Sequence, residues 1–383
     1  MKQMKNKNQP SGNLNAEKRF VFFLITVILI ACVCEVLGWI TVKSYFPKYE
    51  IVRRVLIGSK EDKLIYHQNS VGQAYLLYIP APNFVSAGFI QHNEHGYRGP
   101  AVPLRRTHGK LRILFLGGST TYGWTVDNPN ETYPAFLGKI LEKRLPDGLQ
   151  GIEIINGGVM WGTTAENLTH YIFKYRYYKP DIVVIEEGGN DAQGSAMITT
   201  YQPDYSHWRR TLPEIYPLSS KVRWIMHSRF VSLFVIHTFY SHFFTGHFVR
   251  DDILPPAKWY RSEKSGQIPE KDLAFKNNLS TLIREIRADG SEIVLVPFRP
   301  NPANQYSDNI LAEMTRNEKI LKNLATEFAI DVAPFPAEVI STGNWTDDCH
   351  LSAAGEREKA LHVSQYLIPI INRILIKVKS NLS

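Results

Sequence analysis

The chain has 383 residues, which is enough for one large α/β domain with appended segments, and its 44% hydrophobic and 21% charged residues exclude a wholly disordered protein. Three cysteines are too few for a disulfide framework. The formal charge of +8 comes from scattered bases that cluster mainly beside one apolar segment and at the C-terminus, so we expect charges that flank a membrane and no nucleic acid partner.

A basic N-terminal tail, residues 1–19, precedes an apolar segment, residues 20–42, that is long enough to cross a bilayer as a helix. Glu35 is its one charged residue, at an expected cost of roughly 2–3 kcal/mol. The lysines and arginines on its two sides favour a single-pass membrane anchor with the C-terminal domain in the periplasm or otherwise outside the cytoplasm. The alternative is a lipoprotein signal with Cys32 as the lipidated residue, but the apolar sequence continues past Cys32.

The rest of the chain divides into a lead-in segment (43–110), a main domain (111–371) and a basic tail (372–383). Short apolar runs alternate with helical patterns in the main domain. We predict strands at 111–116, 152–155, 181–185, 293–296 and 329–332, and helices at 133–144, 165–177, 271–287, 309–328 and 352–367. Repeated strand–helix units predict a parallel sheet covered by helices on both faces, with ligands beyond the carboxyl ends of its strands.

An insertion, residues 194–268, interrupts this pattern with an apolar run at 230–236 and three histidines, His237, His242 and His247. Histidines five residues apart do not share one helical face, so we expect no metal cluster there. The apolar run predicts a helical cap or lid whose apolar face lies against the core or the membrane surface.

A serine on a tight turn directly follows the first predicted strand, in residues 117–123 (GGSTTYG). Glycines at such a strand-to-helix turn expose the hydroxyl of Ser119 and leave room for a substrate carbonyl near the backbone. The turn lacks the spacing and the lysine of a phosphate-binding P-loop. Alone it is weak evidence for a nucleophile.

Three further motifs are expected at the same edge of the sheet. Residues 156–162 (NGGVMWG) offer exposed backbone N–H groups, and Asn190, in the motif GGND, offers a side-chain amide to a developing oxyanion. Residues 347–350 (DDCH) have the spacing that lets a carboxylate hold His350 in the tautomer that accepts a proton from serine. Four motifs in this order, each on its own strand-end loop, indicate one site.

With these motifs the sequence resembles the SGNH (GDSL-like) hydrolase family, whose blocks are a Gly-Asp-Ser turn, a glycine block, Gly-x-Asn-Asp and Asp-x-x-His. The resemblance covers roughly residues 93–367 and includes the Tyr97-Arg98-Gly99 turn that is common in membrane-tethered bacterial members. It implies a flavodoxin-like three-layer α/β/α fold. It also implies that Ser119 is the nucleophile, that His350 is its base and that Asp347 is the partner of this base. The side chain of Asn190 would donate to the oxyanion, and we expect the backbone N–H groups of Ser119 and of a glycine to complete the oxyanion hole.

The sequence departs from the family pattern in two places. Gly118 stands where the family usually has aspartate, which removes a carboxylate that stabilises the turn but no catalytic group. In the glycine block an ungapped match puts Trp161 at the donor position, so we predict Gly162 as the donor and keep Gly158 in reserve. Next to Asp347, which the family spacing favours, Asp348 could also face the imidazole. Cys349 is expected to be a small buried neighbour.

We therefore expect a serine esterase or acylhydrolase that acts, without metal or cofactor, on an O-acyl ester such as an O-acetyl group of an extracytoplasmic glycan or lipid. One alternative is an O-acyltransferase that uses the same residues on a surface polysaccharide. Another is a non-catalytic glycan-binding or assembly protein on the same fold. The sequence does not define the oligomeric state.

Overall fold

The structure, a computed structural model, describes residues 16–45, 70–73, 75–86, 88–196, 205, 227–239, 272–303 and 306–380. They fall into two compact units. The first takes the described residues of 1–63 and 217–247, and the second those of 64–216 and 248–383. Part of the predicted insertion therefore groups with the N-terminal segment.

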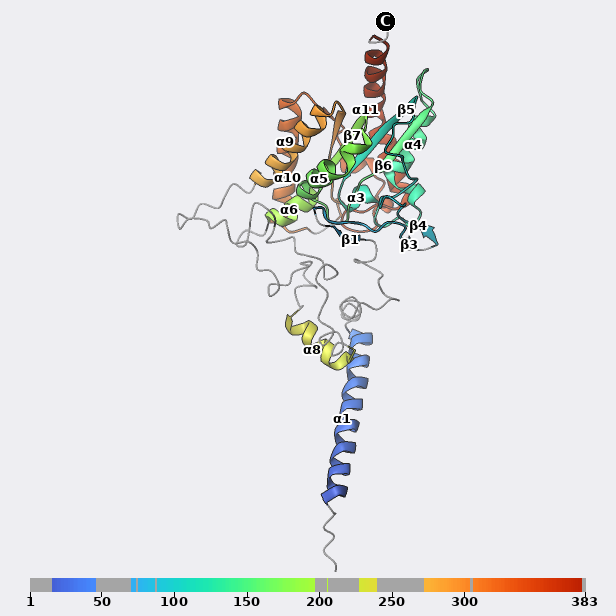
Figure 1. Ribbon diagram of the computed structural model, residues 1–383. Coiled ribbons are helices and arrows are strands. Elements are labelled where there is room, and N and C mark those ends of the chain that lie inside the picture. Colours follow the sequence, from blue (N-terminus) through green and yellow to red (C-terminus); the bar gives the residue numbers. More distant parts are fainter. Residues whose placement is uncertain are drawn as a thin grey trace, which may run out of the picture. The chain divides into compact units, whose positions relative to one another are not determined.

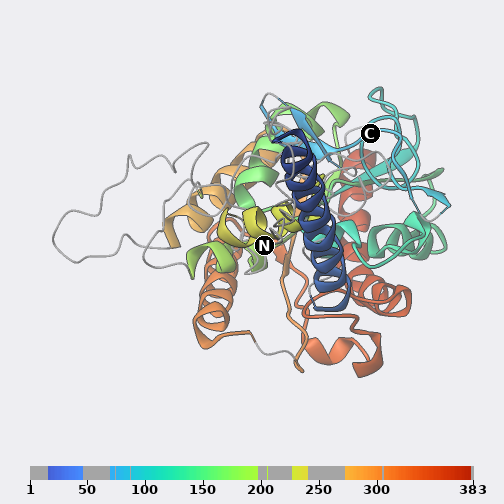
Figure 2. The ribbon, with the colours of Figure 1, turned by 90° about the horizontal axis from the view of Figure 1, so that it is seen from below.

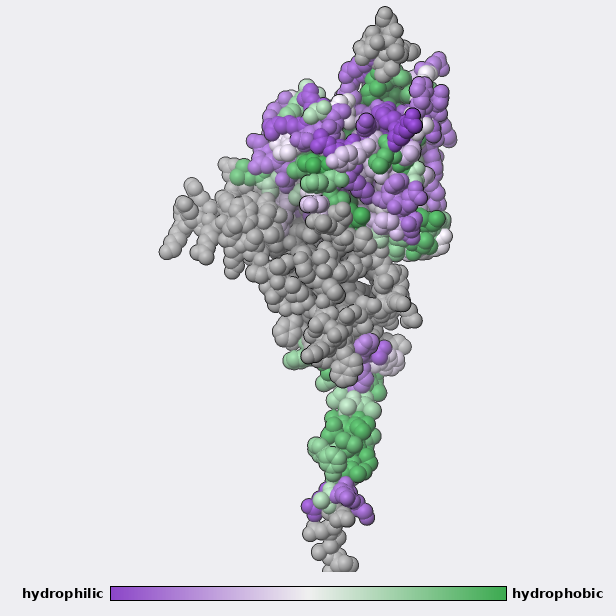
Figure 3. Space-filling view, in the orientation of Figure 1, coloured by the Kyte–Doolittle hydropathy of each residue, from purple (hydrophilic) through white to green (hydrophobic). Residues whose placement is uncertain are grey.

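The described residues of the first unit form two helices, α1 (Ala16–Tyr45) and α8 (Arg229–Phe239). Helix α1 extends beyond both ends of the predicted span 20–42, and the face of it seen in Figure 3 is hydrophobic along most of its length. Among the described residues it is the one helix that is long and apolar enough to cross a membrane, over Ala16–Thr41, although a signal sequence meets the same criteria.

The second unit is built on a parallel sheet of five strands, shown in Figure 1. Its strands are β5 (Lys110–Gly117), β6 (Gly151–Asn156), β7 (Ile182–Glu187), β8 (Glu292–Pro297) and β9 (Asp331–Val332). They lie in the order β6-β5-β7-β8-β9, which is the flavodoxin-like order and reverses between β5 and β7. The predicted flavodoxin-like α/β fold is confirmed.

Successive side chains of the strands enter two separate cores, because they point to opposite faces of the sheet. Ile113 and Phe115 of β5 pack with α4 (Tyr133–Glu142) and α11 (Ala353–Ser380). Leu114 and Leu116 pack on the other face. The helices of that face are α5 (Thr164–Phe173), α9 (Asp272–Ala288) and α10 (Asp308–Glu327). The result is the predicted three-layer arrangement (Figure 1).

The main differences from the predicted helices lie at their ends. Helix α5 ends at Phe173, and a 3-10 turn, Tyr175–Tyr178, completes the segment predicted as helix to residue 177. Helix α11 continues to Ser380, well past the predicted end near residue 367. Ile370 and Ile371 extend its apolar face into the core, which explains why the helix continues into the predicted tail.

The lead-in segment forms two short antiparallel pairs. Strand β1 (Ser70–Gln73) pairs with β2 (Leu77–Pro80), and β3 (Val85–Ser86) pairs with β4 (Phe89–Ile90). Further short helices among the residues that the structure describes are α3 (Ser119–Tyr122), α6 (Gly189–Ser195) and the 3-10 turns Pro129–Glu131, Ala337–Val339 and Thr342–Asn344.

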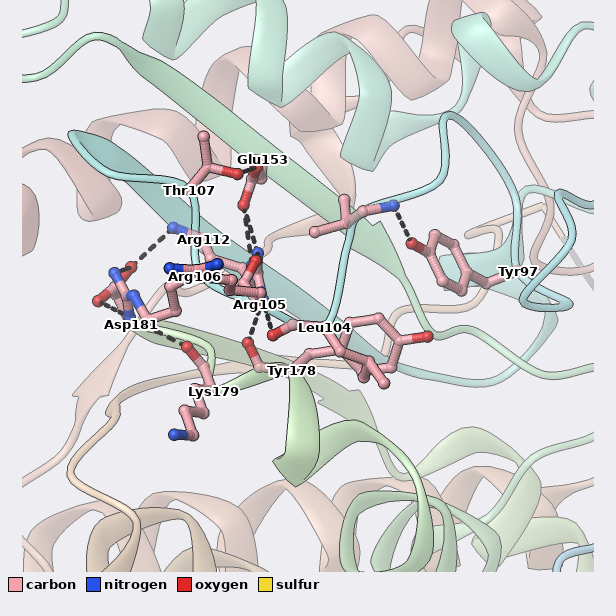
Figure 4. A network of polar contacts seen from close by, with 11 residues as sticks. Tyr97, Leu104, Arg105, Arg106, Thr107, Arg112, Glu153, Tyr178, Lys179 and Asp181 are labelled. Carbon is pink, nitrogen blue, oxygen red and sulfur yellow. Dashed lines mark hydrogen bonds and ion pairs between the residues drawn. The ribbon is translucent and has the colours of Figure 1, made fainter.

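A polar network joins the lead-in segment to the amino ends of three sheet strands (Figure 4). Arg106 makes two hydrogen bonds to Asp181, of 2.7 and 2.8 Å, and Thr107 donates to Glu153. The buried guanidinium of Arg112 pairs with the same Glu153 at 2.7 Å. Because this network lies at the ends of the strands opposite to Ser119, we assign it a structural role.

A second buried ion pair joins β7 to α11. The Nζ of Lys359 lies 2.6 and 2.7 Å from the two carboxylate oxygens of Glu186, and these side chains are only 1% and 2% exposed. The Thr121 hydroxyl, on the nucleophile turn, donates to the same carboxylate at 2.9 Å. The pair therefore connects the sheet, the last helix and the turn that carries Ser119.

Replacing Lys359 with methionine is expected to lower the free energy of unfolding by about 3–5 kcal/mol, because Glu186 stays buried without this cation. Equilibrium denaturation of the full chain in detergent measures the loss. Lys377→Met is the matched control, since Lys377 pairs with Glu292 at the surface and such pairs contribute under about 1 kcal/mol. Equal losses in the two variants would contradict a structural role for the buried pair.

Candidate active site

The candidate site lies at the carboxyl edge of the sheet, where the strand order reverses between β5 and β7. Ser119 begins α3 directly after β5, and Asn190 lies in the first turn of α6 directly after β7. Loops that leave two neighbouring strands on either side of such a switch point form a crevice that binds ligands. The topology thus brings together motifs that are far apart in the sequence.

The turn around Ser119 is short and closely packed. Gly123 caps the C-terminus of α3, and its φ of +79° is in the left-handed region. The glycine block, residues 156–162, packs directly against the turn, because a Cβ at Gly158 would lie only 2.3 Å from the Tyr122 nitrogen. Ser119 occupies the first position of α3, where a backbone N–H has no acceptor within the helix. Its N–H is therefore available to a substrate oxygen.

The structure brings Ser119, His350 and Asp347 into one chain of hydrogen bonds. The Oγ of Ser119 lies 2.8 Å from Nε2 of His350. The other ring nitrogen, Nδ1, lies 2.7 and 2.9 Å from the two carboxylate oxygens of Asp347. This order of contacts allows a proton to pass from the hydroxyl to the imidazole while the carboxylate fixes the ring.

The loop that carries His350 is held by its own backbone. Trp345 pairs with Leu351 across the loop, and Asp347 Oδ1 accepts the N–H groups of Cys349 and His350 at 3.0 and 2.8 Å. These bonds orient the Asp347 carboxylate toward the imidazole. Of the two adjacent aspartates, it is thus Asp347 that contacts His350. The carbonyl of Asp348 instead accepts the Asn301 N–H at 2.8 Å.

His350 and Asp347 shift each other's pKa toward the charged forms. Burial lowers the pKa of His350, but the hydrogen bond and charge of Asp347, together with the Cys349 thiol, outweigh burial and raise it to about 10. Burial raises the pKa of Asp347, whereas the His350 ring and two backbone N–H groups bring it down to about 2. The site therefore stabilises an imidazolium beside a carboxylate, which is the state that follows proton transfer from serine.

This pKa shift predicts an alkaline pH dependence. If His350 is the base that the sequence predicts, only its neutral imidazole accepts a proton, so kcat/KM should rise as pH increases through the pKa of His350, which lies above the ordinary value of 6.5. Asp347→Asn should move the acidic limb of the profile to lower pH and lower the plateau by roughly 10⁴. A pH series of ester hydrolysis measures both effects. An unchanged limb in Asp347→Asn would exclude Asp347 as the partner of His350.

The predicted oxyanion donors contact each other. Asn190 Nδ2 donates to the Gly162 carbonyl at 2.8 Å, and the Gly162 N–H donates to the Val159 carbonyl at 2.9 Å. The N–H of the reserve residue, Gly158, donates to Asn156 Oδ1 at 3.1 Å. Trp161, at the family's donor position, has a φ of +58°, a conformation that usually requires glycine.

The Asn190 side chain lies against Gly118, the glycine that stands in place of the family's aspartate. A Cβ at Gly118 would lie 2.6 Å from Asn190 Nδ2, so the amide fills the space that a side chain at position 118 needs. Glycine at this position therefore accommodates the Asn190 side chain.

Sequence reasoning did not identify a buried residue that braces the nucleophile turn. Arg98 donates to the carbonyls of Gly123 and Val126 at 2.5 and 2.7 Å, and its guanidinium lies over the ring of Tyr122. The Tyr122 hydroxyl also contacts buried His92 at 2.8 Å. The Tyr97-Arg98-Gly99 turn was the available signal, but its target, the end of α3, lies far away in sequence.

Asp191 was part of the GGND motif but had no assigned role. Its buried carboxylate accepts the N–H and hydroxyl of Thr164, at the start of α5, and the hydroxyl of Tyr205. Burial raises its pKa to about 6, against these hydrogen bonds. Asp191 thus ties the loop after β7 to the loop after β6.

Cys349 is half-buried beside the imidazole, not fully buried as expected, with Sγ 3.8 Å from His350 Nδ1. Asp347, Cys349 and His350 each place one metal-ligating atom within 4.8 Å of the others. Both ring nitrogens of His350 already have hydrogen-bond partners in this arrangement. Of the three insertion histidines, His242 and His247 lie outside the described residues, and so does the side chain of His237.

The sheet order defines a flavodoxin-like α/β/α fold, with the candidate site on the loops that follow its strands. A family model for the GDSL-like lipase/acylhydrolase family matches residues 115–358. The chain belongs to that family, and the resemblance seen in its motifs is confirmed.

Solved structures with some similarity include an acetyl xylan esterase variant from Geobacillus stearothermophilus, with 16% identity, a TM-score of 0.40, and coverage of 68% of this chain and 94% of that one. A GDSL-like lipase from Bacteroides thetaiotaomicron VPI-5482 has 14% identity, a TM-score of 0.36, and coverage of 69% and 88%. The structure of TesA has 16% identity, a TM-score of 0.41, and coverage of 67% of this chain and 98% of that one. No curated protein matches the chain.

Proposed function

We propose that the chain is a serine esterase in which Ser119 attacks an ester carbonyl and His350 accepts its proton. The observation that carries the proposal is the continuous chain of hydrogen bonds from the Ser119 hydroxyl through His350 to Asp347. The Ser119–carbonyl bond forms as the proton moves to Nε2, and the alkoxide leaves with that proton. Water then attacks the acyl-enzyme, again with His350 as base.

The proposed oxyanion hole consists of the Ser119 N–H, the Asn190 amide and a backbone N–H of the glycine block. An amide nitrogen carries two protons, so Asn190 can donate to an oxyanion while it keeps its bond to the Gly162 carbonyl. For Gly162 itself to donate, its N–H must leave the Val159 carbonyl. This reorganisation is the part of the proposal that a bound acyl analogue would test.

The proposed substrate is an O-acyl ester, such as an O-acetyl group, on an extracytoplasmic glycan or lipid. Membership of an acylhydrolase family supports the ester, and the apolar helix α1 with its flanking bases supports a single-pass membrane anchor and an extracytoplasmic location. Asp347 is 43% exposed, whereas the His350 side chain is only 14% exposed. Hydrolysis is preferred over acyl transfer because the chain belongs to an acylhydrolase family.

The test is labelling of the detergent-solubilised full chain with a serine-reactive fluorophosphonate. Labelling should be lost in Ser119→Ala and in His350→Ala. It should be kept in His362→Ala, which removes a partly exposed histidine that contacts the Pro334 carbonyl outside the candidate site. Product analysis of an acetylated glycan, with and without an acceptor glycan, then separates hydrolysis from transfer. Absence of labelling in folded wild-type protein would favour a binding role.

A further inference from the structure

In the first unit, Glu35 of α1 contacts the start of α8, which the sequence did not predict. The carboxylate of Glu35, within the apolar part of α1, accepts the backbone N–H of Arg229 at 2.6 Å and of Phe230 at 3.3 Å, and the hydroxyl of Ser228 at 2.8 Å. The first N–H groups of a helix have no acceptor within it, and their positive end attracts a carboxylate. Glu35 therefore caps the N-terminus of α8.

The two helices meet closely at this cap. A Cβ at Gly38 would lie 2.8 Å from the nitrogen and 2.9 Å from the Cα of Phe230, so only glycine permits this approach. Ser232, one turn into α8, is buried. Small residues at a contact allow helix backbones to pack tightly where both helices are surrounded by lipid. Helix α8 lies beside α1 in both ribbon views (Figures 1 and 2).

The exposed side of α8 is apolar. Phe230, Val231 and Phe234 are 47%, 37% and 67% exposed, and the side chains of α1 next to the cap are also apolar and exposed. Contact of so much apolar surface with water is unfavourable, and exposed apolar surface of this kind marks a protein or membrane contact. Phe230 contacts α1 at Glu35 and Gly38, within the candidate span, so the exposed apolar residues of α8 begin beside those of the span, which points to lipid.

We propose that α8 is a second membrane element, an interfacial helix that lies in the bilayer surface beside α1 and is fixed there by Glu35. The inference rests on the proposed membrane anchoring of α1 and goes beyond it, because it assigns part of the insertion to the membrane. It also gives Glu35 a function. The carboxylate accepts the N–H groups at the start of α8, and lipid would offer neither an acceptor to these N–H groups nor a donor to the carboxylate.

The position of Glu35 along α1 places it near the boundary between the hydrocarbon core and the headgroups of the bilayer. The 26-residue span Ala16–Thr41 is about 39 Å long, roughly 9 Å more than the hydrocarbon core. Glu35 lies about 9 Å along the helix from Thr41. In a centred span this is about 4–5 Å below the hydrocarbon boundary, the depth at which amphipathic interfacial helices bury their apolar face. Removal of α1 as a signal sequence would leave α8 without its cap.

The test uses the full chain in phosphatidylcholine–phosphatidylglycerol vesicles, with Cys32, Cys34 and Cys349 replaced by alanine. A single cysteine is introduced by Phe234→Cys and labelled with the environment-sensitive fluorophore NBD. Two matched labels, at Ile28→Cys in α1 and at Leu104→Cys on the exposed surface of the second unit, serve as controls. We expect the Phe234→Cys label to emit at shorter wavelength than the Leu104→Cys label and to lose intensity with shallow nitroxide lipids, not with aqueous iodide.

Two outcomes overturn the inference, and they are distinguishable. If the Ile28→Cys label is quenched by lipid and the Phe234→Cys label by iodide, α1 is an anchor but α8 is not in the membrane. If both are quenched by iodide, the anchoring proposal fails as well.

A second arm tests the cap. Glu35→Ala on the Phe234→Cys background should shift the emission to longer wavelength and restore quenching by iodide, because α8 loses its acceptor. Glu35→Gln keeps an amide oxygen as acceptor and should retain most of the lipid signal. Hydrolysis of a soluble ester by both variants should be unchanged, which shows that the catalytic unit is folded. Unchanged emission in Glu35→Ala would show that Glu35 does not hold α8 in the membrane.

Discussion

Replacing Ser119 with alanine is expected to lower kcat for ester hydrolysis by on the order of 10⁶, the loss seen when a nucleophile that works as a unit with its base is removed. His350→Ala should cost about as much, because the hydroxyl loses the acceptor that lies 2.8 Å from its oxygen. The double variant should be no slower than either single one, since the two side chains perform one step. Hydrolysis of p-nitrophenyl acetate by the purified chain measures all three.

The matched control is Ser341→Ala, which removes an exposed serine that donates to Glu358. It should retain wild-type kcat. Unfolding curves of all variants should be close to wild type, because Ser119 is small and its turn is held by Arg98 and the glycine block. Substantial turnover by Ser119→Ala, or losses that add in the double variant, would exclude the proposed mechanism.

Restoring the family's aspartate, through Gly118→Asp, is expected to lower activity. A side chain at position 118 requires the space of the Asn190 amide, whose nitrogen lies 2.6 Å from the position that its Cβ would take. Displacing this side chain costs the fold little but removes the proposed oxyanion donor. We expect kcat to fall by about 10²–10³, as in Asn190→Ala, with little change in KM.

The two changes should not add. A double-mutant cycle with Gly118→Asp and Asn190→Ala should show that aspartate costs almost nothing once Asn190 is absent, because its effect acts through that side chain. Gly118→Ala, with the same Cβ but no charge, separates the steric effect from charge repulsion. If Gly118→Asp were as active as wild type, or if its loss were the same in both backgrounds, Asn190 would not be the group that it displaces.

Much of the candidate site was predictable because its motifs are local. Each lies directly after a strand or before a helix, and parallel strands bring such loops to one edge of the sheet. Ser119, Asn190 and His350 could therefore be placed together from spacing alone. The buried contacts that support the nucleophile turn could not be predicted. Arg98 contacts the end of α3 and Lys359 pairs with Glu186, and these contacts form only when elements distant in the sequence pack together.

The sequence by itself determined the fold class, since the alternation of apolar runs and helical patterns, a local property, fixes a parallel sheet with two helical layers. It also determined which motifs meet at the carboxyl edge. Only the tertiary structure decided which aspartate faces His350, where the Gly162 N–H points, and that Glu35 contacts Arg229, 194 residues along the chain. These depend on the directions of single bonds between packed elements, and a pattern of residue types does not specify directions.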